Sequence, residues 1–97
     1  MIVLPLREKI AKKTQFPEYV LNTLDIFYTI ASTAHWQTPL SVQQTFPAIE
    51  IHKSGRMILT IAINYRLVIE LNYKMQVIKI RFFDHIDKYD NIDPETV

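Results

Sequence analysis

The spacing of apolar residues changes from helical to strand-like near the middle of the chain. Between Pro17 and Ala34, apolar side chains recur at intervals of four and three residues, which predicts a helix with one buried face. The residues on this face are Val20, Leu24, Phe27, Ala31 and Ala34. We therefore expect one long helix whose role is to pack against a core.

Shorter elements flank this helix. Met1–Leu4 has the composition of a short edge strand, and a helix is expected over Pro5–Lys13, where proline suits the first turn. Thr38-Pro39 predicts the start of another helix, because threonine caps a helix and proline fits its first position. That helix should run through Val42 and stop before Pro47.

The second half of the chain carries apolar, β-branched runs that alternate with polar residues. Their short connections, including a hairpin turn at Lys74-Met75, predict an antiparallel meander. Because no glycine lies near Ala62–Tyr65, Asn64 is expected to supply the positive φ that a tight turn there needs. The predicted strands are Glu50–Lys53, Arg56–Ile63, Tyr65–Tyr73 and Gln76–Phe83.

Alternation along the last two strands separates an aliphatic face from a charged face. Residues two apart share a face, so the aliphatic sets turn toward the helices and the others turn away. The aliphatic sets are Leu67, Ile69 and Leu71, followed by Ile78, Ile80 and Phe82. The opposite face then presents Arg66, Lys79 and Arg81 together. The predicted fold class is α+β, with N-terminal helices packed on one face of a small twisted antiparallel sheet.

Composition limits the size and class of the protein. The 97 residues, of which 48% are hydrophobic, suit a single globular domain over residues 1–97. The absence of cysteine excludes disulfides, and the three histidines lack a zinc-binding spacing, so we expect no metal and no cofactor. No apolar run approaches the ~20 residues of a transmembrane helix. We expect a cytoplasmic protein without a membrane partner.

Charge is distributed unevenly along the chain. Through Phe83 the charged side chains give a net +5, and from Asp84 onward they give a net −4, which includes an acidic tail over about residues 91–97. A basic body suits a polyanionic partner such as RNA. A mixed-charge, solvated surface accounts for the same counts, so composition alone leaves both interpretations open.

Two arginines on neighbouring strands suit chemistry on a phosphodiester. Guanidinium groups bind the phosphate and stabilise the charge that develops during its cleavage. If the 2′-hydroxyl of RNA attacks the adjacent phosphorus, the protein needs groups that accept and donate protons, and no metal. The proton-handling side chains near the arginines are Tyr89, His85 and Lys79. Solvated arginines, or arginines paired with Glu70, are the simpler interpretation.

Several short motifs occur in a fixed order along the chain. They are Trp36, Thr38-Pro39, Phe46-Pro47, Tyr65-Arg66-Leu67, Asn72-Tyr73, Ile80-Arg81-Phe82 and the closing run from Lys88 to Val97. In this order and spacing they resemble the HigB branch of the RelE/ParE superfamily, the toxins of type II toxin–antitoxin modules. The resemblance covers most of the chain and implies a RelE-like fold and a ribosome-dependent endoribonuclease that cuts mRNA during translation.

The resemblance also implies partners and site residues. The implied partners are a HigA-like antitoxin with a helix-turn-helix region, the ribosome and mRNA, with DNA contacted only through the antitoxin. Arg66 and Arg81 match the strand arginines of the family, and Tyr89 matches its C-terminal tyrosine. The family's histidine falls at Ile86, and His85 stands one residue before that position.

These observations lead to the hypothesis of an mRNA interferase toxin. Arg66 and Arg81 would bind and polarise the scissile phosphate, Tyr89 would orient substrate or exchange a proton, and His85 would be a secondary acid or base. The expected contacts to backbone phosphates are Lys53, Arg56, Lys74 and Lys79. The alternative is a non-catalytic interaction protein on the same fold, which blocks a target or is an inactive relic and still binds an antitoxin.

Overall fold

A computed structural model describes residues 1–13 and 15–97 of the chain. Its elements confirm the predicted change from helices to strands, and the helices predicted over Pro5–Lys13 and Pro17–Ala34 are present with slightly shorter bounds. In chain order the elements are β1 (Ile2–Leu4), α1 (Arg7–Lys13), α2 (Glu18–Thr33), α3 (Pro39–Thr45), β2 (Glu50–Ile51), β3 (Met57–Ile61), β4 (Tyr65–Asn72), β5 (Val77–His85) and α4 (Ile86–Tyr89).

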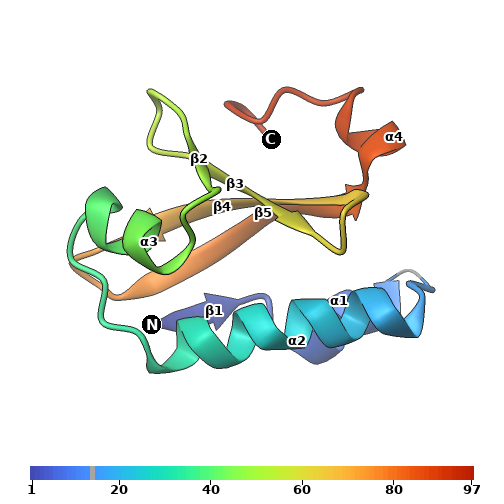
Figure 1. Ribbon diagram of the computed structural model, residues 1–97, viewed down its shortest axis with the longest axis horizontal. Coiled ribbons are helices and arrows are strands. Elements are labelled where there is room, and N and C mark those ends of the chain that lie inside the picture. The colour runs from blue at the N-terminus through green and yellow to red at the C-terminus, as the bar shows by residue number, and fades with distance from the viewer. Residues whose placement is uncertain (14) are drawn as a thin grey trace.

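The strands form a five-stranded sheet in the order β1-β5-β4-β3-β2 (Figure 1). The meander of β2 to β5 is antiparallel, as predicted. β1 pairs with β5 in parallel, with Ile2 opposite Val77, so the sheet is mixed. The parallel pairing arises because β1 and β5 are joined through the whole helical half and the meander rather than by a hairpin. The α+β class is confirmed.

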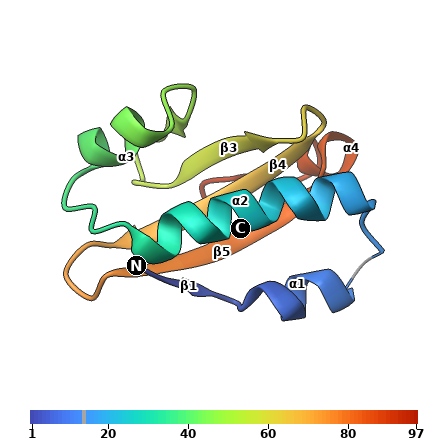
Figure 2. The same cartoon turned by 60° about the horizontal axis from the view of Figure 1, so that its bottom comes forward.

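Helices α1 and α2 lie on the same side of the sheet, and α4 with the C-terminal segment lies on the other (Figure 1). α2 lies along β4 and β5, and α1 follows β1 at the edge of the sheet (Figure 2). The predicted apolar face of α2 is buried, and its largest side chains, Leu24 and Phe27, are 0% and 2% exposed. This face and the sheet beneath it form the hydrophobic core.

Local signals in the sequence explain the short helix α3. The Thr38 side chain accepts a hydrogen bond from the Ser41 amide, and Pro39 occupies the first turn, as predicted. The helix ends at Thr45, whose hydroxyl accepts a hydrogen bond from Trp36 Nε1 at 3.1 Å. Trp36 is buried against Phe46, so α3 is fixed to the end of α2 by aromatic packing.

A β-bulge at Arg81 changes which residues of β5 face the core. Ile69 pairs with Ile80 and Val68 pairs with Phe82, so Arg81 is an extra residue in the ladder. Beyond the bulge, Phe83 packs on the core side, with its ring 5.0 Å from that of Phe16. The prediction that Phe82 shares the core face of Ile80 is therefore wrong, because strict alternation does not pass through a bulge.

The turn between β3 and β4 also differs from the prediction. Positive φ occurs at Ala62 (49°) and Ile63 (66°), and not at Asn64. Asn64 instead connects the turn to α4, because its carbonyl accepts a hydrogen bond from the Ile86 amide at 2.8 Å. Two consecutive left-handed residues without glycine indicate local strain.

Of the helices in residues 1–13 and 15–97, none is long and apolar enough to cross a membrane.

Candidate functional site

The face of β3, β4 and β5 that points away from α1 and α2 carries most of the predicted site residues. We call it the outer face and define it by the paired positions Thr60 and Arg66, Arg66 and Asp84, and Glu70 and Lys79, together with Arg81. α4 and the C-terminal segment pass over it (Figure 1). Val68 is fully buried on this face, so the segment above it covers part of the sheet.

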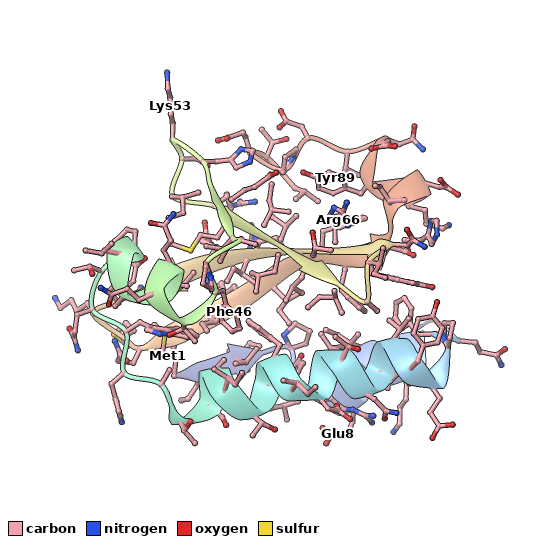
Figure 3. All side chains as sticks on the ribbon, in the orientation of Figure 1. Met1, Glu8, Phe46, Lys53, Arg66 and Tyr89 are labelled. Atoms are coloured by element: carbon pink, nitrogen blue, oxygen red, sulfur yellow. The ribbon has the colours of Figure 1, made fainter. Side chains whose placement is uncertain are left out.

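Arg66 lies at one end of the outer face, next to the strained turn. Its Nη1 donates hydrogen bonds to the carbonyls of Ile63 and Tyr65, each at 3.0 Å. These two contacts hold the guanidinium against the β3–β4 turn. Tyr89, on α4, lies above Arg66 and on the same side of the sheet (Figure 3). The arrangement places a phenol beside a fixed cation.

The Tyr89 hydroxyl is held in its protonated form. Burial raises its pKa above the ordinary tyrosine value, the negative charge of Glu50 raises it further, and Arg66 acts in the opposite direction. Its ring packs against Phe82, with centroids 6.1 Å apart. The phenol can donate a hydrogen bond, and the raised pKa disfavours the phenolate that a base would require.

Arg81 lies on the outer face with its own set of partners. Its Nη1 is 4.0 Å from Glu70 Oε1, and its Nε donates to the Val97 carbonyl at 3.3 Å. The pairing with Glu70 that we considered from the sequence is present. Arg81 and Arg66 share a face, as predicted, but each is held by different groups, so they form two neighbouring cationic positions.

Arg56 differs from the predicted surface contact, because its side chain is buried. Only 7% of the residue is exposed, and its Nε lies 3.4 Å from Glu70 Oε2. Its Nη1 donates to the carbonyls of Pro94 and Val97. A phosphate can reach Arg56 only when the C-terminal segment moves away.

The three predicted lysine contacts occupy another end of the protein. Lys74 and Lys79 line a pocket of about 700 Å³ together with Tyr73 and Met75. Lys53 projects into solvent from the connection between β2 and β3 (Figure 3). Lys79 belongs to the outer face but lies opposite Glu70 rather than Arg66.

His85 is not brought together with Arg66 and Tyr89. Its Nδ1 accepts a hydrogen bond from the Asp87 amide at 3.1 Å, which caps the start of α4. Its ring packs edge-on against Tyr65, a core residue, at 5.3 Å. The structure therefore gives His85 a capping and packing role on the helical side of the sheet.

Two residues that sequence reasoning did not select lie near Tyr89. The charge of Glu50 acts on the Tyr89 hydroxyl, and His52 Nε2 lies 3.7 Å from Glu50 Oε2. His52 Nδ1 is 2.6 Å from Glu95 Oε1. The sequence contains no spacing that joins His52 to Glu95, because these two residues meet only when the C-terminal segment folds back. Within residues 1–13 and 15–97, no group of three or more acidic and histidine side chains could hold a metal ion.

Most of the chain matches a known protein family. The sequence profile of the HigB toxin, described as a RelE-like toxic component of a toxin–antitoxin system, matches residues 21–92. The chain belongs to the HigB toxin family. The resemblance predicted from the sequence motifs is thereby confirmed. No curated protein matches the chain.

Membership of the HigB family implies a partner protein. The toxic component of a toxin–antitoxin system has an antitoxin as its partner, so this HigB-family toxin has one. The matched residues run from α2 to just beyond α4 and include Arg66, Arg81 and Tyr89. The segment over residues 93–97, which covers Arg56, lies outside the match.

Proposed function

We propose that this toxin is a ribosome-dependent mRNA endoribonuclease and that its site is the outer face around Arg66, Arg81 and Tyr89. One observation carries the proposal: guanidinium groups from β4 and β5 and a protonated phenol from α4 are gathered on the one side of the sheet that α1 and α2 leave uncovered. Cations and a hydrogen-bond donor are the groups that stabilise a phosphodiester during cleavage.

In this proposal Arg66 binds the scissile phosphate. Because Nη1 is engaged by two backbone carbonyls, Nε and Nη2 remain as the parallel donor pair that binds phosphate in a bidentate manner. Arg81 binds the same or the neighbouring phosphate. Lys53, Lys74 and Lys79 hold RNA beyond the site, and their contribution is electrostatic and salt-dependent.

RNA supplies its own nucleophile, the 2′-hydroxyl, so the protein has to move protons and stabilise charge. Tyr89 donates a hydrogen bond to a phosphate oxygen or to the leaving 5′-oxygen. Glu50, whose charge acts on Tyr89, and His52, 3.7 Å from that carboxylate, provide a carboxylate oxygen and an imidazole nitrogen that can accept a proton. The ribosome holds the mRNA in a fixed orientation, and this positioning of the substrate contributes to catalysis.

The proposal includes a partner and a place in the cell. A HigA-like antitoxin with a helix-turn-helix region would neutralise the toxin, and DNA would be contacted only through it. A protein that acts on translating ribosomes would work in the cytoplasm.

The test is expression of the toxin with and without its antitoxin, followed by mapping of mRNA 5′ ends. We expect growth arrest and cleavage that depends on translation, and we expect Arg66→Ala to reduce cleavage by roughly 100-fold or more, as for loss of one transition-state donor. Lys9→Ala is the matched control, because it removes one exposed positive charge from α1, on the other side of the sheet.

The second candidate function is a non-catalytic toxin that blocks its target. The position of His85, which caps α4 and packs against Tyr65 on the helical side of the sheet, favours this candidate. Growth arrest without new mRNA 5′ ends, equally strong in wild type and in Arg66→Ala, would support it and exclude the nuclease.

A further inference from the structure

The outer face contains two arginines that share one side-chain carboxylate. Arg56 and Arg81 approach the carboxylate of Glu70, at 3.4 Å and 4.0 Å. Arg56 is 93% shielded from solvent, so water screens its guanidinium charge poorly. An anion placed between the two arginines would be strongly attracted.

The position between the arginines is filled by main-chain oxygens of the chain itself. The Val97 carbonyl accepts from both Arg56 Nη1 and Arg81 Nε, and the Pro94 carbonyl accepts from Arg56 Nη1 at 3.2 Å. Arginine and phosphate form charge-assisted pairs that are often bidentate, and a phosphate has several oxygens that can reach both guanidinium groups. A phosphate would therefore compete for this position.

The segment that supplies these carbonyls, Asp93–Val97, is held by contacts that do not involve the arginines. Asp93 accepts hydrogen bonds from the amides of Glu95 and Thr96, at 2.9 Å and 3.1 Å, which folds the segment into a turn. His52 Nδ1 lies 2.6 Å from Glu95 Oε1 and fixes that turn to the β2–β3 connection. We call Asp93–Val97 the strap.

The strap contributes little to the hydrophobic core. None of its residues is buried, and none belongs to the core cluster. Segments with few buried apolar contacts open at a small fraction of the global free energy of unfolding. The strap can therefore leave the sheet while the fold stays intact.

We propose that the strap is an autoinhibitory cover over a phosphodiester-binding subsite formed by Arg56 and Arg81, and that RNA binds there by displacing it. The inference deepens the proposed nuclease function, because it assigns regulation to the same face. Displacement exposes Arg56, frees Arg81 Nε and releases His52 from Glu95 in one movement. The contact between His52 and Glu95, which we call the latch, determines how readily the strap leaves the sheet.

The experiment uses the full chain and a 2′-O-methyl oligouridylate, which binds as RNA but lacks the free 2′-hydroxyl needed for cleavage. Nuclear magnetic resonance follows the Arg81 Nε–H signal and the backbone amides of Thr96 and Val97 during titration. We expect the Arg81 signal to shift and both amides to move toward the values of an unstructured chain, in proportion to bound oligonucleotide.

Affinity is measured by fluorescence anisotropy for Glu95→Ala, which opens the latch without touching an arginine. We expect binding about fivefold tighter than wild type, which corresponds to ~1 kcal/mol. Glu8→Ala is the control, because it removes the same charge from α1, on the far side of the sheet (Figure 3). It should change affinity by less than about twofold, as for a distant exposed charge.

The proposal is overturned if the strap amides keep their positions at saturation, if Glu95→Ala gains no more affinity than Glu8→Ala, or if the oligonucleotide fails to bind. Its failure is separable from that of the proposed function. If the strap is displaced but no translation-dependent cleavage occurs, only the proposed nuclease function is refuted. If the protein cleaves mRNA while the strap stays in place, only the proposed autoinhibition by the strap is refuted.

Discussion

The strained turn between β3 and β4 predicts that a substitution by glycine raises the stability of the protein. Ile63 has φ of 66°, in the left-handed region, and its side chain is 80% exposed. Left-handed φ at a residue other than glycine costs on the order of 1–3 kcal/mol, and a β-branched side chain is a poor choice for it. Ile63→Gly removes that strain and keeps the backbone carbonyl that binds Arg66. We therefore expect glycine to stabilise the protein.

The magnitude follows from three terms. Relief of strain contributes about 2 kcal/mol, which is the middle of the range for left-handed residues. The added freedom of glycine in the unfolded chain costs ~0.7 kcal/mol. Loss of the one-fifth of the side chain that is buried costs ~0.4 kcal/mol. The net stabilisation is about 1 kcal/mol, or a rise in melting temperature of about 4–8 °C for a domain of this size.

The assay is urea and thermal unfolding of Ile63→Gly against wild type. The control is Ile26→Gly, which makes the same change at a residue that is 60% exposed within the regular helix α2. Glycine there should destabilise by about 0.5–1 kcal/mol. If both variants lost stability by similar amounts, with unchanged dependence on urea, the turn would carry no strain and the reasoning would be refuted.

Three further predictions concern the hydrophobic core, the strap and the tyrosine Tyr28. Leu24→Ala, at a fully buried residue of α2, should cost about 2–5 kcal/mol of unfolding free energy, whereas Ile26→Ala should change it by less than about 0.5 kcal/mol, as measured in urea. Hydrogen bonds from Ser54 and the neighbouring imidazole lower the pKa of Glu95. The stabilisation of the strap by Glu95 should therefore be present above the ordinary glutamate range and lost as pH falls through the lowered pKa. The amide signals of the strap, measured across that pH range, would show whether this stabilisation is lost. Burial raises the pKa of Tyr28 to about 12, so phenolate absorbance should show a late-ionising component that Tyr28→Phe reduces. Stability should fall as pH rises from the ordinary tyrosine value toward about 12.

Periodicity was sufficient to predict the layers of this fold. The stripe of α2 and the alternation of β4 depend on local spacing, and the structure buries Leu24 and Leu67 as expected. The parallel pairing of β1 could not be predicted, because a three-residue strand carries no signal about its partner. The left-handed φ at Ala62 and Ile63 contradicts local preference, and only the pairing of the flanking strands imposes it.

The candidate site was predictable as far as it depends on alternation. Arg66 and Arg81 lie on one face because residues of a strand alternate. The burial of Arg56 and the contact of His52 with Glu95 were not predictable, because both require residues about 40 positions apart to meet through the folded-back strap. Phe82 and Phe83 are chemically identical, so the sequence contains no sign of which one enters the core.

The bulge has one more consequence for the length of β5. Ile80 and Phe82 pair with adjacent residues of β4, so deletion of Arg81 would leave each β4–β5 pair with the partner it has now. Arg81 is dispensable to the ladder, and the strand is one residue longer than its hydrogen bonding requires. An insertion of this kind adds a cation to a sheet face and keeps the strand pairs on either side, so the number of charges on such a face can change while the paired residues stay the same.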